Sequence, residues 1–162
     1  WFGRVLEQEN FLWYEEPMRE FDLPSYQQLC AALDIPVLAA ETSDGCHWNM
    51  ATWIQYRALD MVRTNCGYKG GITGALKIAH LAEAFGMRAQ VHGMGMANLH
   101  LCAAIPNNDY YEQLIISSEQ IRGLKNLGPL SIVNGYLQAP TAPGLEPHPD
   151  WATIERTAIA TC

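Results

Sequence analysis

The stretch DMVRTNCGYKGGITGALKIAHLAEAFGMRAQV, residues 60–91, decides the fold class. Its clearest element is a helix predicted over Thr73–Phe85, where five apolar residues recur at helical spacing and share one face. These residues are Ala75, Ile78, Ala79, Ala82 and Phe85. Gly86 follows as the glycine that ends a helix. The flanking segments Asp60–Thr64 and Arg88–Val91 predict strands, so the stretch indicates one strand–helix–strand unit of a parallel sheet.

The same alternation continues outward in both directions. Three further short apolar runs predict buried strands: Phe11–Tyr14, Val37–Ala40 and Tyr110–Ile115. Three further segments predict helices: Pro24–Leu33, Asn49–Arg57 and Ala97–Ala104. This order indicates parallel βα units, either in an open doubly wound sheet or in a closed barrel. The glycine-rich Gly70–Gly74 lacks a phosphate-binding lysine arrangement, and no G-x-G-x-x-G pattern joins a strand to a helix, so a dinucleotide-binding fold has little support.

The composition changes after the last of these predicted strands. Gly128–Pro149 is rich in Gly and Pro and holds one predicted strand, Ser131–Val133. Asp150 then predicts the N-cap of a closing helix over Trp151–Ala158.

Charge and composition exclude several classes of partner. Hydrophobic residues make up 49% and charged residues 17% of the chain, which is typical of a globular protein with a buried core. The net charge of −7, without a run of Lys or Arg, argues against nucleic acid or an anionic membrane as a partner. No apolar stretch approaches the ~20 residues that span a bilayer. Because the chain opens with Trp1 rather than Met, we expect a longer parent protein.

The cysteines indicate a reducing compartment. They are odd in number, scattered and never in C-x-x-C spacing: Cys30, Cys46, Cys66, Cys102 and Cys162. We therefore expect free thiols and a cytoplasmic location, rather than a disulfide framework or a zinc ribbon.

Polar residues fall at the ends of the predicted strands, where α/β barrels carry their chemistry. In chain order they are Glu15, Glu41, Asn65, His92 and Glu112, the last within its strand. Glu15 and Glu41 would enter one cavity from adjacent strands, and two like charges there require a cation. Carboxylate oxygens with an open position suit Mg²⁺.

Each of these residues also has a plainer interpretation when taken alone. Glu15-Glu16-Pro17 is compatible with a solvated turn, Glu41 with a loop acid and His92 with a structural histidine. Three other histidines we expect to be structural or exposed: His47, His80 and His100. The metal-site interpretation is favoured because every candidate falls at a strand end, in sequence order.

Seven segments resemble motifs of one known family, in the family's order. They are Trp13–Pro17, Ile35–Glu41, Gly70–Ala79, Ala89–His92, Tyr111–Glu112, Asn134–Tyr136 and Pro143–Leu145. The family is the mandelate racemase/muconate lactonizing enzyme branch of the enolase superfamily. WYEEP resembles its W-[IFY]-E-E-P motif, and GGITGALKIA resembles its GG-[IV]-T-x-x-x-x-[IAS]-A signature. The similarity covers nearly the whole chain.

The resemblance implies a fold and a domain organisation. The fold would be α/β, a partial (β/α)₈ TIM barrel holding strands four to eight and a C-terminal tail. Residues 1–127 would be the C-terminal part of the catalytic barrel, and residues 128–162 a tail that returns toward an N-terminal capping domain. That capping domain, the third carboxylate ligand and a Lys-x-Lys pair would all precede Trp1.

The resemblance also implies roles for the five polar residues. Glu15 and Glu41 would bind Mg²⁺, His92 would be a general base or acid, and Glu112 would hydrogen-bond the substrate carboxylate. Asn65 stands where the family has an Asp that pairs with the histidine. We expect the Asn65 carbonyl to orient the imidazole without adding a negative charge.

The implied activity is abstraction of the proton α to a carboxylate, by a racemase or dehydratase acting on a hydroxy acid or sugar acid. The expected partners are a small-molecule carboxylate substrate and, in the full-length parent, further copies of the same protein. In a partial barrel, open sheet edges would also favour association. A second hypothesis is that the chain is a catalytically incomplete fragment or a non-catalytic binding relative. A zinc hydrolase on the same barrel would require a His-x-His strand, which is absent.

Overall fold

The computed structural model describes residues 1–93, 95–119, 132–145 and 150–159. The chain separates into two compact units, residues 1–115 and residues 116–162. The domain boundary predicted between residues 127 and 128 lies outside the described residues and stays a prediction.

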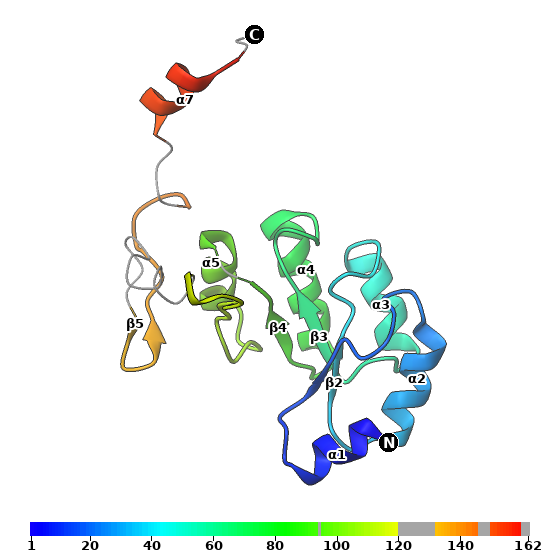
Figure 1. Cartoon of the computed structure of the whole chain (residues 1–162). Coiled ribbons are helices and arrows are strands. Elements are labelled where there is room, and N and C mark those ends of the chain that lie inside the picture. The colour runs from blue at the N-terminus through cyan, green and yellow to red at the C-terminus, as the bar shows by residue number, and fades with distance from the viewer. Residues whose placement is uncertain (94, 120–131, 146–149, 160–162) are drawn as a thin grey trace. The chain divides into compact units, whose positions relative to one another are not determined.

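The first unit is built on a parallel sheet whose strands follow one another in chain order (Figure 1). The strands are β1 (Tyr14–Glu15), β2 (Val37–Ala39), β3 (Met61–Thr64) and β4 (Ala89–Val91). All three strands after β1 consist of buried residues, as expected for a parallel sheet. Parallel pairing brings the carboxyl ends of the strands to the same edge, so side chains at those ends lie together.

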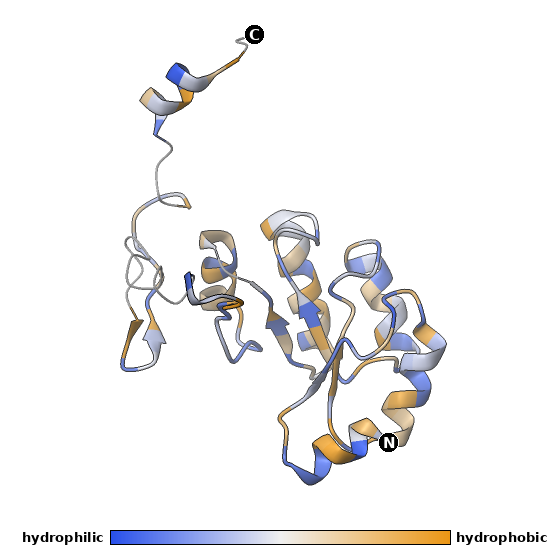
Figure 2. Ribbon diagram, in the orientation of Figure 1, coloured by the Kyte–Doolittle hydropathy of each residue, from blue (hydrophilic) through white to orange (hydrophobic). Residues whose placement is uncertain are grey.

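A helix follows each strand, and one more precedes the sheet. They are α1 (Phe2–Gln8), α2 (Leu23–Ala32), α3 (His47–Gln55), α4 (Gly71–Ala84) and α5 (Met96–Ala104). Four of the five residues predicted for the apolar face of the fourth helix are buried, whereas Phe85, just after the helix ends, is exposed. Helix α4 packs between α3 and α5 against β3 and β4 (Figure 1). Figure 2 shows apolar and polar stretches along these helices, as expected of helices with one buried face.

The predicted helices and three of the predicted strands are confirmed with boundaries within two residues. The strand predicted at Phe11–Tyr14 is wrong in position, because β1 covers Tyr14–Glu15. Phe11 and Leu12 are exposed, and the Phe11 N–H donates to the carbonyl of Leu6 in the turn that leaves α1. Glu15 therefore lies in its strand rather than after it.

The strand predicted at Tyr110–Ile115 does not form. The outer edge of β4 is hydrogen-bonded in another way, because the Ala89 N–H donates to the carbonyl of Asn107 and the Val91 N–H to Oδ1 of Asn108. These bonds take the positions that a fifth strand would have used, so the segment runs beside β4 without joining the sheet. The sheet described here thus holds four of the five predicted strands.

The second unit contains an antiparallel pair, β5 (Ile132–Val133) and β6 (Tyr136–Leu137), and helix α7 (Trp151–Thr157). Asn134 and Gly135 join the pair with positive φ angles of 51° and 81°, which a two-residue hairpin turn requires. Ser131 of the predicted strand lies outside the described residues. The predicted cap is confirmed, because Oδ1 of Asp150 accepts from the Thr153 N–H at 3.1 Å.

Candidate active site

Glu41 is the most enclosed of the predicted site residues. It follows β2 directly after Ala40, which adopts a left-handed φ of 73°, and only 4% of Glu41 is exposed. Its Oε1 accepts from Nδ2 of Asn65 at 2.7 Å, and its Oε2 lies 2.6 Å from Nδ1 of His92. One carboxylate therefore joins the carboxyl ends of β2, β3 and β4.

Asn65 has a different partner from the one we expected. Its Oδ1 accepts from the backbone N–H groups of Gly67 and Tyr68, at 2.5 and 3.0 Å. Because the carbonyl is used by this turn, the amide nitrogen is the atom that points into the site, where it donates to Glu41. The expectation that Asn65 orients the imidazole is corrected, since the group facing Nδ1 of His92 is the carboxylate of Glu41.

His92 stands between two carboxylates. Glu41 faces Nδ1, and Oε1 of Glu112 lies 3.6 Å from Nε2. The backbone carbonyl of His92 also accepts from Nδ2 of Asn98 at 2.9 Å, which fixes the chain just after β4. The His92 side chain is 28% exposed, and its Nδ1 is held by Glu41.

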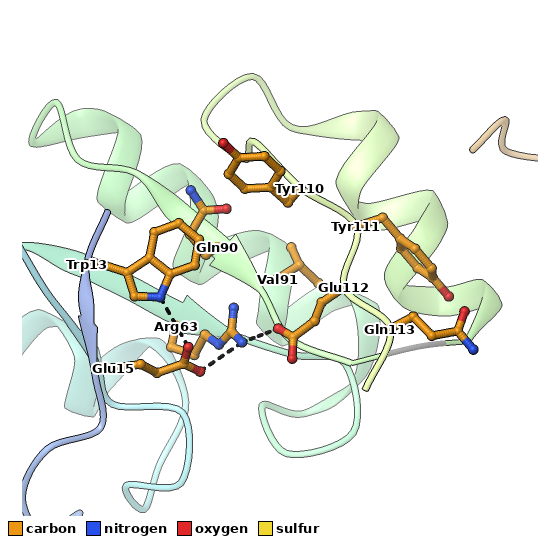
Figure 3. Close-up of a pocket in the computed structure, with 9 residues that line it drawn as sticks. All are labelled: Trp13, Glu15, Arg63, Gln90, Val91, Tyr110, Tyr111, Glu112 and Gln113. Carbon is orange, nitrogen blue, oxygen red and sulfur yellow. Dashed lines mark hydrogen bonds and ion pairs between the residues drawn. The ribbon is translucent and has the colours of Figure 1, made fainter. Parts of the chain in front are cut away.

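Arg63 links the remaining two predicted residues and was missed by sequence analysis. Its Nη2 lies 2.8 Å from Oε1 of Glu15 and also contacts Oε2 of Glu112 (Figure 3). Nε1 of Trp13 donates to Oε2 of Glu15 at 3.2 Å. These four residues line a cavity of about 350 Å³ together with Gln90. One sequence signal could have revealed Arg63. It is a charged residue within a strand of buried residues, two positions before Asn65.

Glu16 is a third carboxylate beside the two predicted metal ligands. Its Oε1 accepts from the Glu41 N–H at 2.9 Å. Burial, and then the charges of Glu41 and Glu15, raise the pKa of Glu16 above its ordinary value of 4.5. The ends of β1 and β2 therefore carry an excess of negative charge.

The comparisons with known proteins decide the family. Residues 1–152 match the family described as Enolase C-terminal domain-like. The chain belongs to the enolase superfamily. A solved structure of a D-glucarate dehydratase from Agrobacterium tumefaciens, complexed with magnesium, is 42% identical with a TM-score of 0.85. It is matched over 95% of this chain and 41% of that one.

Two further relatives agree. The L-talarate/galactarate dehydratase of Salmonella typhimurium (strain LT2) is 38% identical over 112 residues, which are 68% of this chain and 27% of that protein. The structure of a mandelate racemase/muconate lactonizing enzyme-like protein from Roseovarius sp. TM1035 is 28% identical with a TM-score of 0.77, over 95% of this chain and 39% of that one. The chain thus spans less than half the length of each of these relatives.

Membership in the enolase superfamily confirms the predicted partial barrel. The family match over residues 1–152 includes the strands β1 to β4 and the helices that follow them. None of the described helices reaches the length and apolar character that a bilayer span requires.

The donor atoms of this enolase-superfamily chain fit Mg²⁺ in part. Glu15 and Glu41 present carboxylate oxygens from adjacent strands, and Mg²⁺ is commonly held by one or two carboxylates, with waters and substrate completing its shell. Burial and the nearby carboxylates of Glu41 and Glu15 raise the pKa of Glu16, and a bound cation would offset such clustered negative charge. No group of three or more His, Cys, Asp or Glu side chains suited to a metal occurs among the described residues, so further ligands would come from elsewhere.

Proposed function

We propose that the complete protein containing this chain is a Mg²⁺-dependent dehydratase of a sugar acid, and that the chain supplies Glu15, Glu41 and His92 to its active site. The observation that carries this proposal is the position of His92, held at Nδ1 by the buried Glu41, with Nε2 facing Oε1 of Glu112 at 3.6 Å. The relatives at 38% and 42% identity are both acid-sugar dehydratases by name, which supports dehydration over racemisation.

Glu15 and Glu41 would hold the metal. Bound Mg²⁺ would stabilise the negative charge that develops on the substrate carboxylate. Asn65 would keep Glu41 in place through its amide donor, and Arg63 would do the same for Glu15 through its guanidinium group. Both contacts would fix the orientation of a metal-binding carboxylate, and neither Asn65 nor Arg63 would bind the metal itself.

His92 would move the proton. With the Nδ1 proton donated to Glu41, Nε2 would be the basic ring nitrogen, and it would take a proton from the carbon next to the carboxylate. The same nitrogen can return that proton to a leaving hydroxyl group, which completes the loss of water.

Glu112 would bind substrate hydroxyls. The resemblance implied a hydrogen bond to the substrate carboxylate, but Glu112 is ion-paired with Arg63 and faces His92. An ion-paired carboxylate accepts hydrogen bonds and repels other carboxylates. This arrangement suits the several O–H groups of a sugar acid better than a second carboxylate.

The proposal concerns the complete protein. Its small-molecule carboxylate substrate, cytoplasmic location and association into homo-oligomers stay predictions. The second hypothesis, that the chain taken alone is not catalytic, is favoured by the two-carboxylate donor set in the described residues. The two hypotheses are compatible, because the missing ligand and the capping domain would belong to the same complete protein.

The test is the Glu41→Gln variant of the complete protein, assayed for Mg²⁺-dependent water loss from a panel of sugar acids. Loss of turnover is expected, since a neutral amide is a poor Mg²⁺ ligand and a weaker acceptor for the Nδ1 proton of His92. Glu83→Gln, on the exposed side of α4, is the matched control. Wild-type turnover by Glu41→Gln would overturn the proposal.

A further inference from the structure

Lys69 is a buried lysine whose amine is surrounded by backbone and hydroxyl oxygens. Only 1% of the residue is exposed, in the loop between β3 and α4. Nζ donates to the carbonyl of Ser43 at 2.6 Å, to the carbonyl of Gly45 at 3.4 Å and to Oγ of Ser43 at 3.5 Å. All these acceptors belong to the loop between β2 and α3. A buried ammonium ion requires such bonds, so this side chain ties one loop to the other.

A hydrogen bond in the opposite direction, from the first loop to the second, is also present. The carbonyl of Lys69 accepts from Sγ of Cys46 at 3.0 Å, so each loop donates to the other. Gly74 makes this approach possible, because a Cβ there would lie 1.8 Å from the Lys69 carbonyl and 2.7 Å from Sγ of Cys46. The two loops are therefore closely packed at the start of α4, and neither can shift without breaking bonds of the other.

The two residues that meet in the site lie at the beginnings of these loops. Glu41 is the second residue of the first loop and Asn65 is the first residue of the second, and they share the 2.7 Å hydrogen bond described above. Ser43, the main acceptor of Lys69, lies two residues after Glu41, and its Oγ donates back to the Ala40 carbonyl at 3.0 Å. The Lys69 N–H donates to the carbonyl of Asn65 at 3.1 Å. Lys69 is thus linked to the Glu41 side of the bond by its amine and to the Asn65 side by its backbone N–H.

We propose that Lys69 is a positioning residue that fixes the carboxylate of Glu41 by holding the Ser43–Gly45 loop. The inference rests on the proposed function, in which Glu41 is a metal ligand. It assigns to Lys69 no contact with substrate or metal. Its effect would be exerted on Mg²⁺ affinity and turnover through the geometry of Glu41.

The test compares three variants of the complete protein. Lys69→Met keeps the length of the side chain and removes the donors, whereas Lys69→Arg keeps charge and donors. Lys77→Met makes the same change on the exposed side of α4. Mg²⁺ affinity is measured by calorimetry, kcat and KM by water loss from the sugar acid, and loop order by hydrogen exchange over residues 41–46.

Lys69→Met is expected to weaken Mg²⁺ binding by about tenfold or more, the range seen when a residue supporting a metal ligand is lost. The kcat should fall while KM for the sugar acid is unchanged, and exchange over residues 41–46 should accelerate. Lys69→Arg should recover most of the Mg²⁺ affinity, and Lys77→Met should match the wild type. If Lys69→Met does not fold, Lys69→Gln takes its place and should change the same quantities in the same direction.

Three outcomes would contradict the inference. If the wild type binds Mg²⁺ and the Lys69 variants bind it equally well, the inference is overturned and the proposed function stands. If the wild type itself binds no Mg²⁺, the proposed function is overturned and the role of Lys69 falls with it. Accelerated exchange without any change in Mg²⁺ affinity would reduce Lys69 to a purely structural residue and would also overturn the inference.

Discussion

Glu41 and Glu112 flank the same histidine, but they are held in opposite ways. Glu41 extends a strand that is paired on both sides, and its position is set by backbone and amide contacts. Glu112 lies in a segment without strand pairing, and its carboxylate is held by the ion pair with Arg63 and faces His92. One side of the site is therefore fixed by the sheet, and the other by electrostatics within a cavity. The electrostatic side should be the more sensitive to charge and salt.

The largest effect is expected from Arg63→Met, which removes the cation between Glu15 and Glu112. Removing one member of a fully buried pair costs about 3–5 kcal/mol, and the loss here should be smaller, about 2–3 kcal/mol, because both carboxylates keep some contact with water. The side chains of Glu15 and Glu112 are 33% and 30% exposed, respectively. Urea unfolding gives the free energy.

A double variant, Arg63→Met with Glu112→Gln, measures the interaction energy between Arg63 and Glu112. The double variant should be less destabilised than the sum of the single variants, since each carboxylate is costly only when it has lost its partner. Additive losses would mean that Arg63 does not hold Glu112, and the contrast between the two sides of the site would fail.

A smaller loss is expected from Asn65→Asp, which tests the side fixed by the sheet. The substitution restores the residue that the family usually has, yet it places a carboxylate where an amide now donates to Glu41 at 2.7 Å. Repulsion and the lost hydrogen bond should lower the free energy of unfolding by about 2 kcal/mol at neutral pH without metal.

The loss should shrink as the pH falls, because one proton can then be shared between Glu41 and the carboxyl group that the Asn65→Asp substitution introduces. Thermal melts in EDTA across a range from acidic to neutral pH measure this change, and Asn10→Asp at an exposed turn is the control. If the Asn65→Asp variant were as stable as the wild type at neutral pH, the amide donor would not be a support of Glu41.

The pKa of Glu16 gives a milder, pH-dependent prediction. The folded protein raises this pKa above 4.5, so it favours the protonated carboxyl group over the ionised one. The resulting stability is fully present below the unfolded pKa and is lost as the pH rises through the folded pKa. Glu16→Gln should therefore be more stable than the wild type above that range, and equally stable below it.

Chemical denaturation without Mg²⁺, with Glu83→Gln as the exposed control, measures the difference between the two proteins. A difference of constant size from low to neutral pH would mean that charge at Glu16 is not the cause. Addition of Mg²⁺ should reduce the advantage of Glu16→Gln, because a bound cation offsets the clustered carboxylates.

The smallest effect is expected from Arg88→Met, whose partner lies in the same segment as Glu112 but at the surface. Arg88 and Asp109 form an ion pair in which both side chains are 40% exposed. Such pairs contribute about 0–1 kcal/mol, so the free energy of unfolding should barely change. A loss as large as that of Arg63→Met would show that surface contacts, rather than the buried arginine, anchor the segment.

Sequence analysis predicted much of this arrangement for a simple physical reason. Parallel strands end at one edge of the sheet, so chemistry-bearing residues at strand ends are found by reading along the chain. The helix over Thr73–Phe85 and the strands beside it are confirmed almost to the residue, because their apolar periodicity is strong. The five site residues do form one connected series of contacts, once Arg63 is included.

The partners within that series could not be predicted in the same way. The Asn65 carbonyl is taken by a local turn, and only coordinates show that its amide therefore faces Glu41. The predicted strand at Tyr110–Ile115 has the composition of a strand. A strand can form there only if the backbone groups at the edge of β4 are available for hydrogen bonding, and those groups are bonded to Asn107 and Asn108. Apolar periodicity predicts neither the hydrogen-bond partner of the Asn65 amide nor the failure of residues 110–115 to form a strand.

The hydrogen bonds along β4 have a consequence for assembly. An exposed sheet edge is a template on which another chain can add a strand, and proteins commonly protect such edges. Here the donors of Ala89 and Val91 are already engaged by Asn107 and Asn108, so an incoming strand would have to displace two formed bonds before gaining any. Copies of this chain should therefore resist polymerising through β4.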